Sequence, residues 1–103
     1  DQYMGVPYGV ETLFFNKPTG TAYGLALMAL KTGAPVVPVF AYTENSSGKH
    51  VVEFLPAIPL EEKSTRDSTI KHMTQVYTTA IEKIVLQHPD QWMWIHRRWK
   101  PVD

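Results

Sequence analysis

The arrangement of hydrophobic and polar positions along the chain predicts two helices, of which the first is the more buried. Residues 22–31 are apolar nearly all round, a pattern typical of a helix that is covered on more than one side. Thr19 and Thr21 are the residues able to cap its first turn, and Gly33 supplies a C-terminal stop. We therefore predict a buried helix in this segment.

The second predicted helix is long and amphipathic and covers residues 68–87. Asp67 or Ser68 is the expected N-terminal cap. The apolar residues recur every three or four positions, which places them on one face of a helix: Ile70, Met73, Val76, Tyr77, Ala80, Ile81, Ile84 and Val85.

Three further segments predict β-strands. Residues 10–15 alternate weakly and stop at the sequence Asn16-Lys17-Pro18. Residues 36–42 form a largely β-branched run without polar interruption, as expected for a strand buried on both faces. Turn residues 45–48 and the segment 49–55 then predict the return of a hairpin. The fold class that follows is α/β, with a mixed sheet, a buried helix and a long amphipathic C-terminal helix.

Length and composition narrow the possible functions. A chain of 103 residues is one domain at most, and its formal net charge of zero gives no global argument for binding nucleic acid. The absence of cysteine excludes disulfides and thiolate metal sites. No two histidines stand at ligand spacing on one element, and no apolar run approaches about 18 residues. We therefore expect neither a metal nor a cofactor, and no transmembrane helix.

The segment 89–100 concentrates three tryptophans with Arg97, Arg98 and Lys100. Because tryptophan is costly to expose and arginine is costly to bury, this alternation predicts a seam where an apolar surface meets anionic groups or a partner chain. The alternative interpretation is that the tryptophans pack on the sheet while the basic side chains are solvated.

Four segments together resemble one known family: Asp1-Gln2, the run 14–21 that leads into Gly24, the block 31–40, and the terminal segment 89–100. In order and spacing they are similar to the bacterial lipid A biosynthesis acyltransferases, the lauroyl/myristoyl-type enzymes of the lysophospholipid acyltransferase superfamily. The resemblance covers nearly the whole chain, but it corresponds to the C-terminal part of such an enzyme.

One departure from the family concerns catalysis. Enzymes of this superfamily use a histidine followed five positions later by an acidic residue, which orients the imidazole that deprotonates the attacking hydroxyl. Here the residues five positions after His50, His72, His88 and His96 are Leu55, Tyr77, Met93 and Pro101. The resemblance thus implies that residues 1–103 are the C-terminal portion of one acyltransferase domain, inactive alone, whose catalytic dyad lies upstream.

The resemblance also implies roles for individual residues. Asp1 and Gln2 would lie beside the active site, the segment with Phe15, Pro18 and Thr21 would line the acyl or acceptor channel, and Arg97 and Arg98 would face anionic groups. The competing interpretations are a frayed terminus for the first pair and core packing or helix capping for the second set.

The partners implied are acyl carrier protein as acyl donor, a lipid A precursor as acceptor, and a membrane surface, with the full-length protein on the cytoplasmic face of the bacterial inner membrane. Two other functions remain open: a non-catalytic module that binds anionic lipid through its Trp/Arg end, and, less favoured because the net charge is zero, binding of single-stranded nucleic acid. A sheet without upstream strands would expose an edge, so we also predict self-association.

Overall fold

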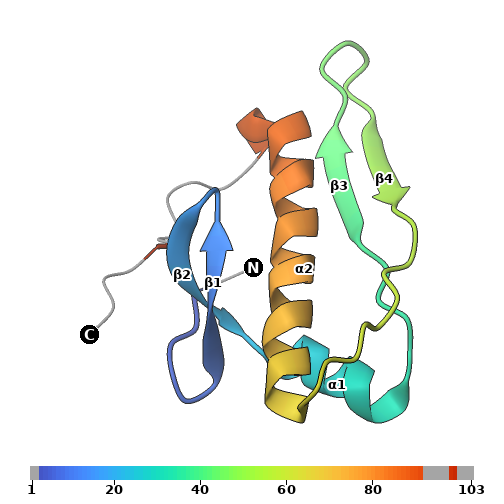
Figure 1. Ribbon diagram of the computed structural model, residues 1–103. Helices are drawn as coiled ribbons and strands as arrows, with labels where there is room; N and C mark the ends of the chain where they lie inside the picture. Colours follow the sequence, from blue (N-terminus) through green and yellow to red (C-terminus); the bar gives the residue numbers. More distant parts are fainter. Residues whose placement is uncertain (1–2, 92–97, 100–103) are drawn as a thin grey trace.

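The computed structural model describes residues 3–91 and 98–99, and within them two helices, a short 3-10 turn and four strands follow one another. The elements are β1 (Gly9–Phe14), β2 (Lys17–Ala22), α1 (Gly24–Thr32), β3 (Val39–Thr43), β4 (His50–Phe54), α2 (Arg66–Gln87) and η1 (Pro89–Gln91). The predicted α/β class is confirmed. The predicted mixed sheet is not found among the described residues, whose strands form two separate antiparallel pairs, β1–β2 and β3–β4, on either side of α2 (Figure 1).

Helix α2 organises the core. It begins with a capping box, in which the Thr65 hydroxyl accepts a hydrogen bond from the Ser68 backbone N–H and the Ser68 hydroxyl accepts one from the Thr65 N–H. The cap is therefore Thr65, which lies two residues before Asp67 and three before Ser68, the two predicted caps. On the buried face of the helix, Ile70, Met73 and Tyr77 pack with Ala26 of α1, so the predicted amphipathic pattern is confirmed.

The β1–β2 hairpin corrects the predicted start of the first helix. Phe15 and Asn16 adopt positive φ angles of 51° and 62° and form a two-residue turn, so the chain returns as β2 instead of stopping. Thr19 and Thr21 consequently lie in a strand and do not cap a helix. Helix α1 starts at Gly24, where the N-cap residue makes no side-chain capping hydrogen bond, and ends as predicted at Gly33, whose φ is 71°. The expectation that this helix is covered on more than one side is wrong, because Ala26 and Ala29 are buried whereas Leu25 and Met28 are exposed.

Two glutamines connect the helical layer to the strands. The Gln75 side chain on α2 accepts a hydrogen bond from the Leu13 N–H (2.7 Å) and donates one to the Leu13 carbonyl (2.9 Å). The Gln91 side chain in η1 likewise accepts a hydrogen bond from the Thr43 N–H (3.4 Å) and donates one to the Thr43 carbonyl (3.0 Å). Each amide thus occupies the position that a neighbouring strand would take beside β1 and β3.

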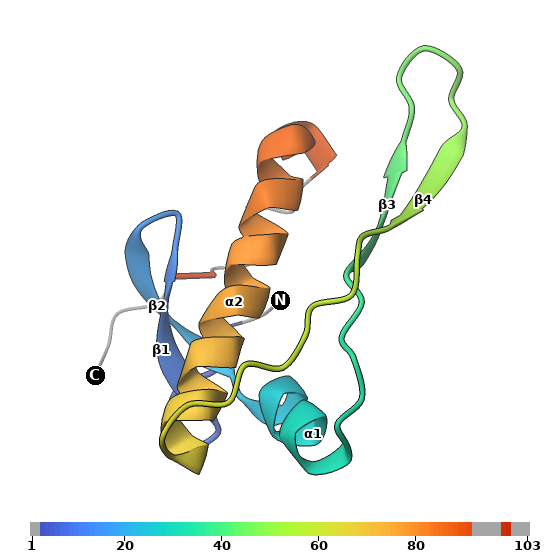
Figure 2. The ribbon, with the colours of Figure 1, turned by 45° about the vertical axis from the view of Figure 1, so that its right-hand side comes forward.

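The β3–β4 hairpin has one covered and one exposed face. Val39 lies opposite Phe54 in the register, and these residues are 50% and 72% exposed. Val52 is 57% exposed. Figure 2 shows this hairpin extending away from α2, whereas β1–β2 lies along it. The expectation that residues 36–42 form a strand buried on both faces is therefore wrong, because α2 approaches only the face of β3 that carries Phe40 and Tyr42.

None of the helices that the structure describes combines the length and the apolar character needed to cross a bilayer.

Candidate functional site

A cavity of about 250 Å³ lies where the end of β2 and the start of α1 meet α2. Most of its wall is apolar, and one charged side chain, that of Arg98, contributes to it. The lining residues are Phe14, Thr21, Ala22, Gly24, Leu25, Thr74, Tyr77, Thr78, Ile81 and Arg98. Local structure explains the polar members, since alternate residues of β2 face α2 and the threonines of α2 recur at positions 74 and 78.

Arg98 is held against β2 and is only 4% exposed. Its Nη1 donates hydrogen bonds to Thr19 Oγ1 and to the Gly20 carbonyl, both at 2.9 Å, and its Nη2 donates to Thr21 Oγ1 at 2.5 Å. Its own carbonyl accepts a hydrogen bond from Thr19 Oγ1 at 2.6 Å. The guanidinium carbon lies 5.3 Å from the centroid of the Phe14 ring, which adds a cation–π contact.

The charge of Arg98 is not balanced by a carboxylate of the described residues, whose ion pairs involve Glu61 alone as the acid. Burial accordingly lowers the pKa of Arg98 below its ordinary value, although a guanidinium stays charged in proteins. Tyr77 lines the same cavity, and its hydroxyl is buried without a hydrogen-bond partner in the part of the chain described. Burial raises the pKa of Tyr77, so this hydroxyl remains a neutral donor.

The threonine hydroxyls of the cavity are already engaged. Thr74 donates to the Ile70 carbonyl at 2.7 Å, and Thr78 donates to the Thr74 carbonyl at 2.8 Å. Thr21 Oγ1 shares a 2.7 Å hydrogen bond with Thr12 Oγ1. The donors with capacity to spare are therefore those of Arg98 and Tyr77, and together they suit an anion.

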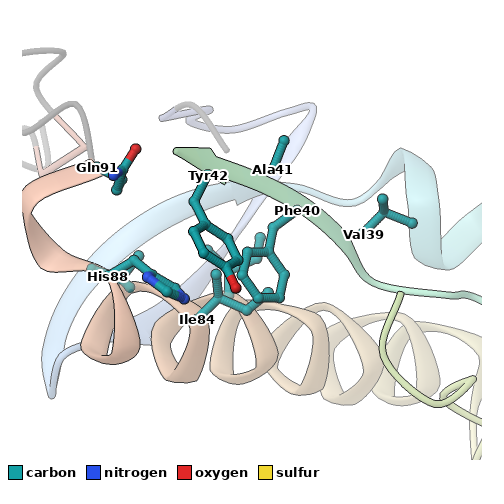
Figure 3. A pocket seen from close by; sticks show the side chains of 9 residues that line it. Val39, Phe40, Ala41, Tyr42, Ile84, His88 and Gln91 are labelled. Atoms are coloured by element: carbon teal, nitrogen blue, oxygen red, sulfur yellow. The ribbon is translucent and has the colours of Figure 1, made fainter. Parts of the chain in front are cut away.

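A second hollow of about 260 Å³ adjoins the first at Ile81, which lines both. Figure 3 shows Phe40 and Tyr42 from β3 turned toward His88 and Ile84 at the end of α2. The rings of Tyr42 and His88 stack at a centroid distance of 4.0 Å. Desolvation, followed by the 3.2 Å hydrogen bond to Glu53, raises the pKa of Tyr42. This hollow is thus a largely apolar groove with an aromatic wall.

The predicted site residues fall into two groups. Thr21 and Arg98 meet at the first cavity, whereas Phe15 is half-buried in the hairpin turn, with its ring 4.7 Å from that of Phe14, and Pro18 is exposed on β2. Asp1, Gln2 and Arg97 lie outside the described residues, and so do Trp92 and Trp94.

Trp99 shows how the terminal segment attaches to the hairpin. Its indole N–H donates to the Phe14 carbonyl at 3.1 Å, and its ring lies 5.3 Å from that of Phe14. Lys17 stands 5.9 Å from the Trp99 ring centroid. For Trp99 this arrangement matches the interpretation that the tryptophans pack on the strands, but Arg98 is buried and not solvated.

Three residues that line or border the two hollows were not predicted as site residues from the sequence: Tyr77, Thr19 and His88. Tyr77 fits the apolar face of α2, so its pattern carried no sign of an unbonded hydroxyl. Thr19 looked like a cap because β2 was not foreseen. His88 follows the helix as its C-cap residue, and only the tertiary fold brings it to Tyr42.

Among the described residues no cluster of acidic and histidine side chains is arranged to hold a metal.

The fold and site define an α/β unit with a mostly apolar cavity and a buried guanidinium that forms no ion pair with any carboxylate of residues 3–91 or 98–99. The chain belongs to the bacterial lipid A biosynthesis acyltransferase family, whose model matches residues 1–101. A lipid A biosynthesis acyltransferase of Haemophilus influenzae is 28% identical over 95 residues, which cover 92% of this chain and 28% of that relative. The chain thus spans little more than a quarter of the length of the curated relative that it matches.

Proposed function

We propose that this chain forms part of an acyltransferase that moves a fatty acyl group from acyl carrier protein to a hydroxyl of a lipid A precursor. The observation that carries the proposal is the family match over residues 1–101. The apolar walls of the two adjoining hollows support a role with alkyl chains. Residues 1–103 would form the C-terminal portion of the acyltransferase domain, at the cytoplasmic face of the inner membrane.

The chemistry requires a base that this chain does not contain. In the proposed reaction a histidine oriented by an acidic residue five positions later removes the proton of the acceptor hydroxyl. The oxygen attacks the thioester carbonyl, a C–O bond forms, the C–S bond breaks, and the proton passes to the departing thiolate. None of the four histidines of this sequence has an acid at that spacing. The residues described here would shape the site and position its ligands.

The test compares the full-length protein with this chain in a transfer assay. Purified membranes containing the full-length protein are incubated with labelled acyl–acyl carrier protein and a lipid A precursor, and the acylated product is followed by mass spectrometry. We expect transfer by the full-length protein and none by residues 1–103. Transfer by residues 1–103 alone would contradict the assignment of the base, and absence of transfer by the full-length protein would contradict the proposed activity.

A further inference from the structure

The cavity between β2 and α2 contains a buried cation that lacks a counter-charge. Arg98 is 4% exposed, and its guanidinium donates three hydrogen bonds to neutral oxygens of β2. No carboxylate of residues 3–91 or 98–99 pairs with it. A buried charge is costly unless an opposite charge accompanies it. The part of the chain that the structure describes therefore leaves this site one negative charge short.

Tyr77 places a second donor at the same cavity. This residue is 8% exposed, and its hydroxyl is buried without a hydrogen-bond partner among the described residues. A guanidinium has five N–H groups, so the three hydrogen bonds to β2 do not exhaust Arg98. The planar fork of arginine matches a carboxylate, and hydrogen bonds between charged groups are the strong ones. One carboxylate would neutralise the guanidinium and accept hydrogen bonds from both side chains.

An exposed apolar strip on α1 adjoins this cavity. Leu25 lines the cavity and is itself 50% exposed, so the cavity opens to the surface on the side of α1. Met28 follows three positions later on the same face of the helix and is 65% exposed. Helix α1 follows β2 along the chain and lies beside the first turns of α2 (Figure 1). Exposed apolar residues at the mouth of a charged site are typical of an interface.

We propose that this cavity and the strip formed by Leu25 and Met28 dock an acidic segment of the full-length protein that lies outside residues 1–103. In the docked state an Asp or Glu side chain accepts hydrogen bonds from Arg98 and Tyr77, and apolar residues beside it cover the strip. The curated relative is long enough to supply such a segment, because the matched 95 residues are only 28% of it.

Charge and attachment select this occupant. A single guanidinium balances a single carboxylate, whereas a doubly charged group would leave an uncompensated charge in a desolvated site. A side chain of the same polypeptide is also held close to the cavity by the chain itself, which gives it a high effective concentration. The inference rests on family membership and not on the proposed reaction, so a failure of acyl transfer would not bear on it.

The first test compares Tyr77→Phe in the full-length protein and in residues 1–103, by thermal unfolding without acyl donor or acceptor. In residues 1–103 the hydroxyl has no described partner, so the midpoint should not fall. In the full-length protein the variant loses a hydrogen bond to a carboxylate, and we expect the midpoint to fall by about 3 °C. The exposed Tyr8→Phe is the matched control and should change neither midpoint. Any other pattern for Tyr77→Phe would overturn the proposal, including a shift that appears only after a lipid A precursor is added, which would make the anion a ligand.

The second test identifies the acid in the full-length protein. Arg98→Lys puts a primary amine at the site, and a carbodiimide condenses that amine with a contacting carboxylate to an amide, itself taking up the water as a urea. Peptide mass spectrometry then locates the other end of the cross-link. We expect an Asp or Glu outside residues 1–103, and no cross-link to the same acid from the exposed control Arg66→Lys. A missing cross-link, or one to an acid within residues 1–103, would overturn the proposal. If Arg98→Lys failed to fold, the Tyr77→Phe comparison would still decide.

Discussion

At the scale of single residues, Arg98 shows what a sequence can and cannot reveal. The alternation of tryptophan and arginine marked the terminal segment, and the family resemblance pointed to both Arg98 and Thr21. Neither indicated that the guanidinium would be buried against β2, because its acceptors lie 77 to 79 positions earlier in the chain. Burial and pairing of this kind arise from tertiary contact, which local patterns do not contain.

Replacing Arg98 by methionine tests its contribution to stability. The variant loses three charge-assisted hydrogen bonds to β2 and recovers only part of the cost of desolvating the guanidinium. We expect the free energy of unfolding, measured by urea denaturation, to fall by about 2 kcal/mol. Arg66→Met, at an exposed position, is the control and should change stability by less than about 0.5 kcal/mol. An unchanged midpoint for Arg98→Met would show that these hydrogen bonds are energetically neutral.

At the scale of elements, long periodic segments were predicted well and the hairpin at the start of the chain was not. Helix α2 and the β3–β4 turn follow from apolar spacing and from turn residues. Strand β2 was missed because Pro18 normally ends a strand. In the register Pro18 lies opposite Leu13, whose N–H and carbonyl bond to Gln75, so this pair exchanges no ladder hydrogen bonds and the missing N–H has no cost.

The end of α1 provides a matched pair of glycine substitutions. Gly33 has a φ of 71° and donates its N–H to the Ala29 carbonyl at 2.8 Å, a conformation that a side chain disfavours. Gly33→Ala should lower the free energy of unfolding by about 1 kcal/mol. Gly24→Ala, at the other end of the helix and with open space around its Cα, should raise it by about 0.5 kcal/mol. Thermal and urea unfolding measure both, and a stabilised Gly33→Ala would refute the capping argument.

At the scale of the whole molecule, the two hairpins have different surroundings. The β1–β2 pair lies along α2 and is joined to Arg98 and Trp99, whereas the β3–β4 pair projects from the helix with an apolar outer face (Figures 1 and 2). That face carries Val39, Val52 and Phe54. Exposed apolar patches of this kind favour association, so the self-association expected from the sequence stays a prediction, now with a definite location.

Substituting the outer face tests that location. The double variant Val52→Thr with Phe54→Thr keeps strand-forming side chains and removes exposed apolar area. We expect residues 1–103 to elute from a sizing column as concentration-dependent oligomers, and the variant to shift toward the monomer. The control is Leu86→Gln on α2, an exposed apolar residue outside the hairpin. If the control dissociated the oligomer and the double variant did not, the interface would lie elsewhere.

The glutamine contacts with Leu13 and Thr43 bear on how such association would proceed. A strand edge with open backbone groups is a template for another chain. At Leu13 and Thr43 those groups are already satisfied by amides from α2 and η1. The helical layer therefore protects one strand edge of each hairpin within the same chain, because its amides block strand addition at these two points. Face-to-face contact is then the route by which copies of the chain would meet.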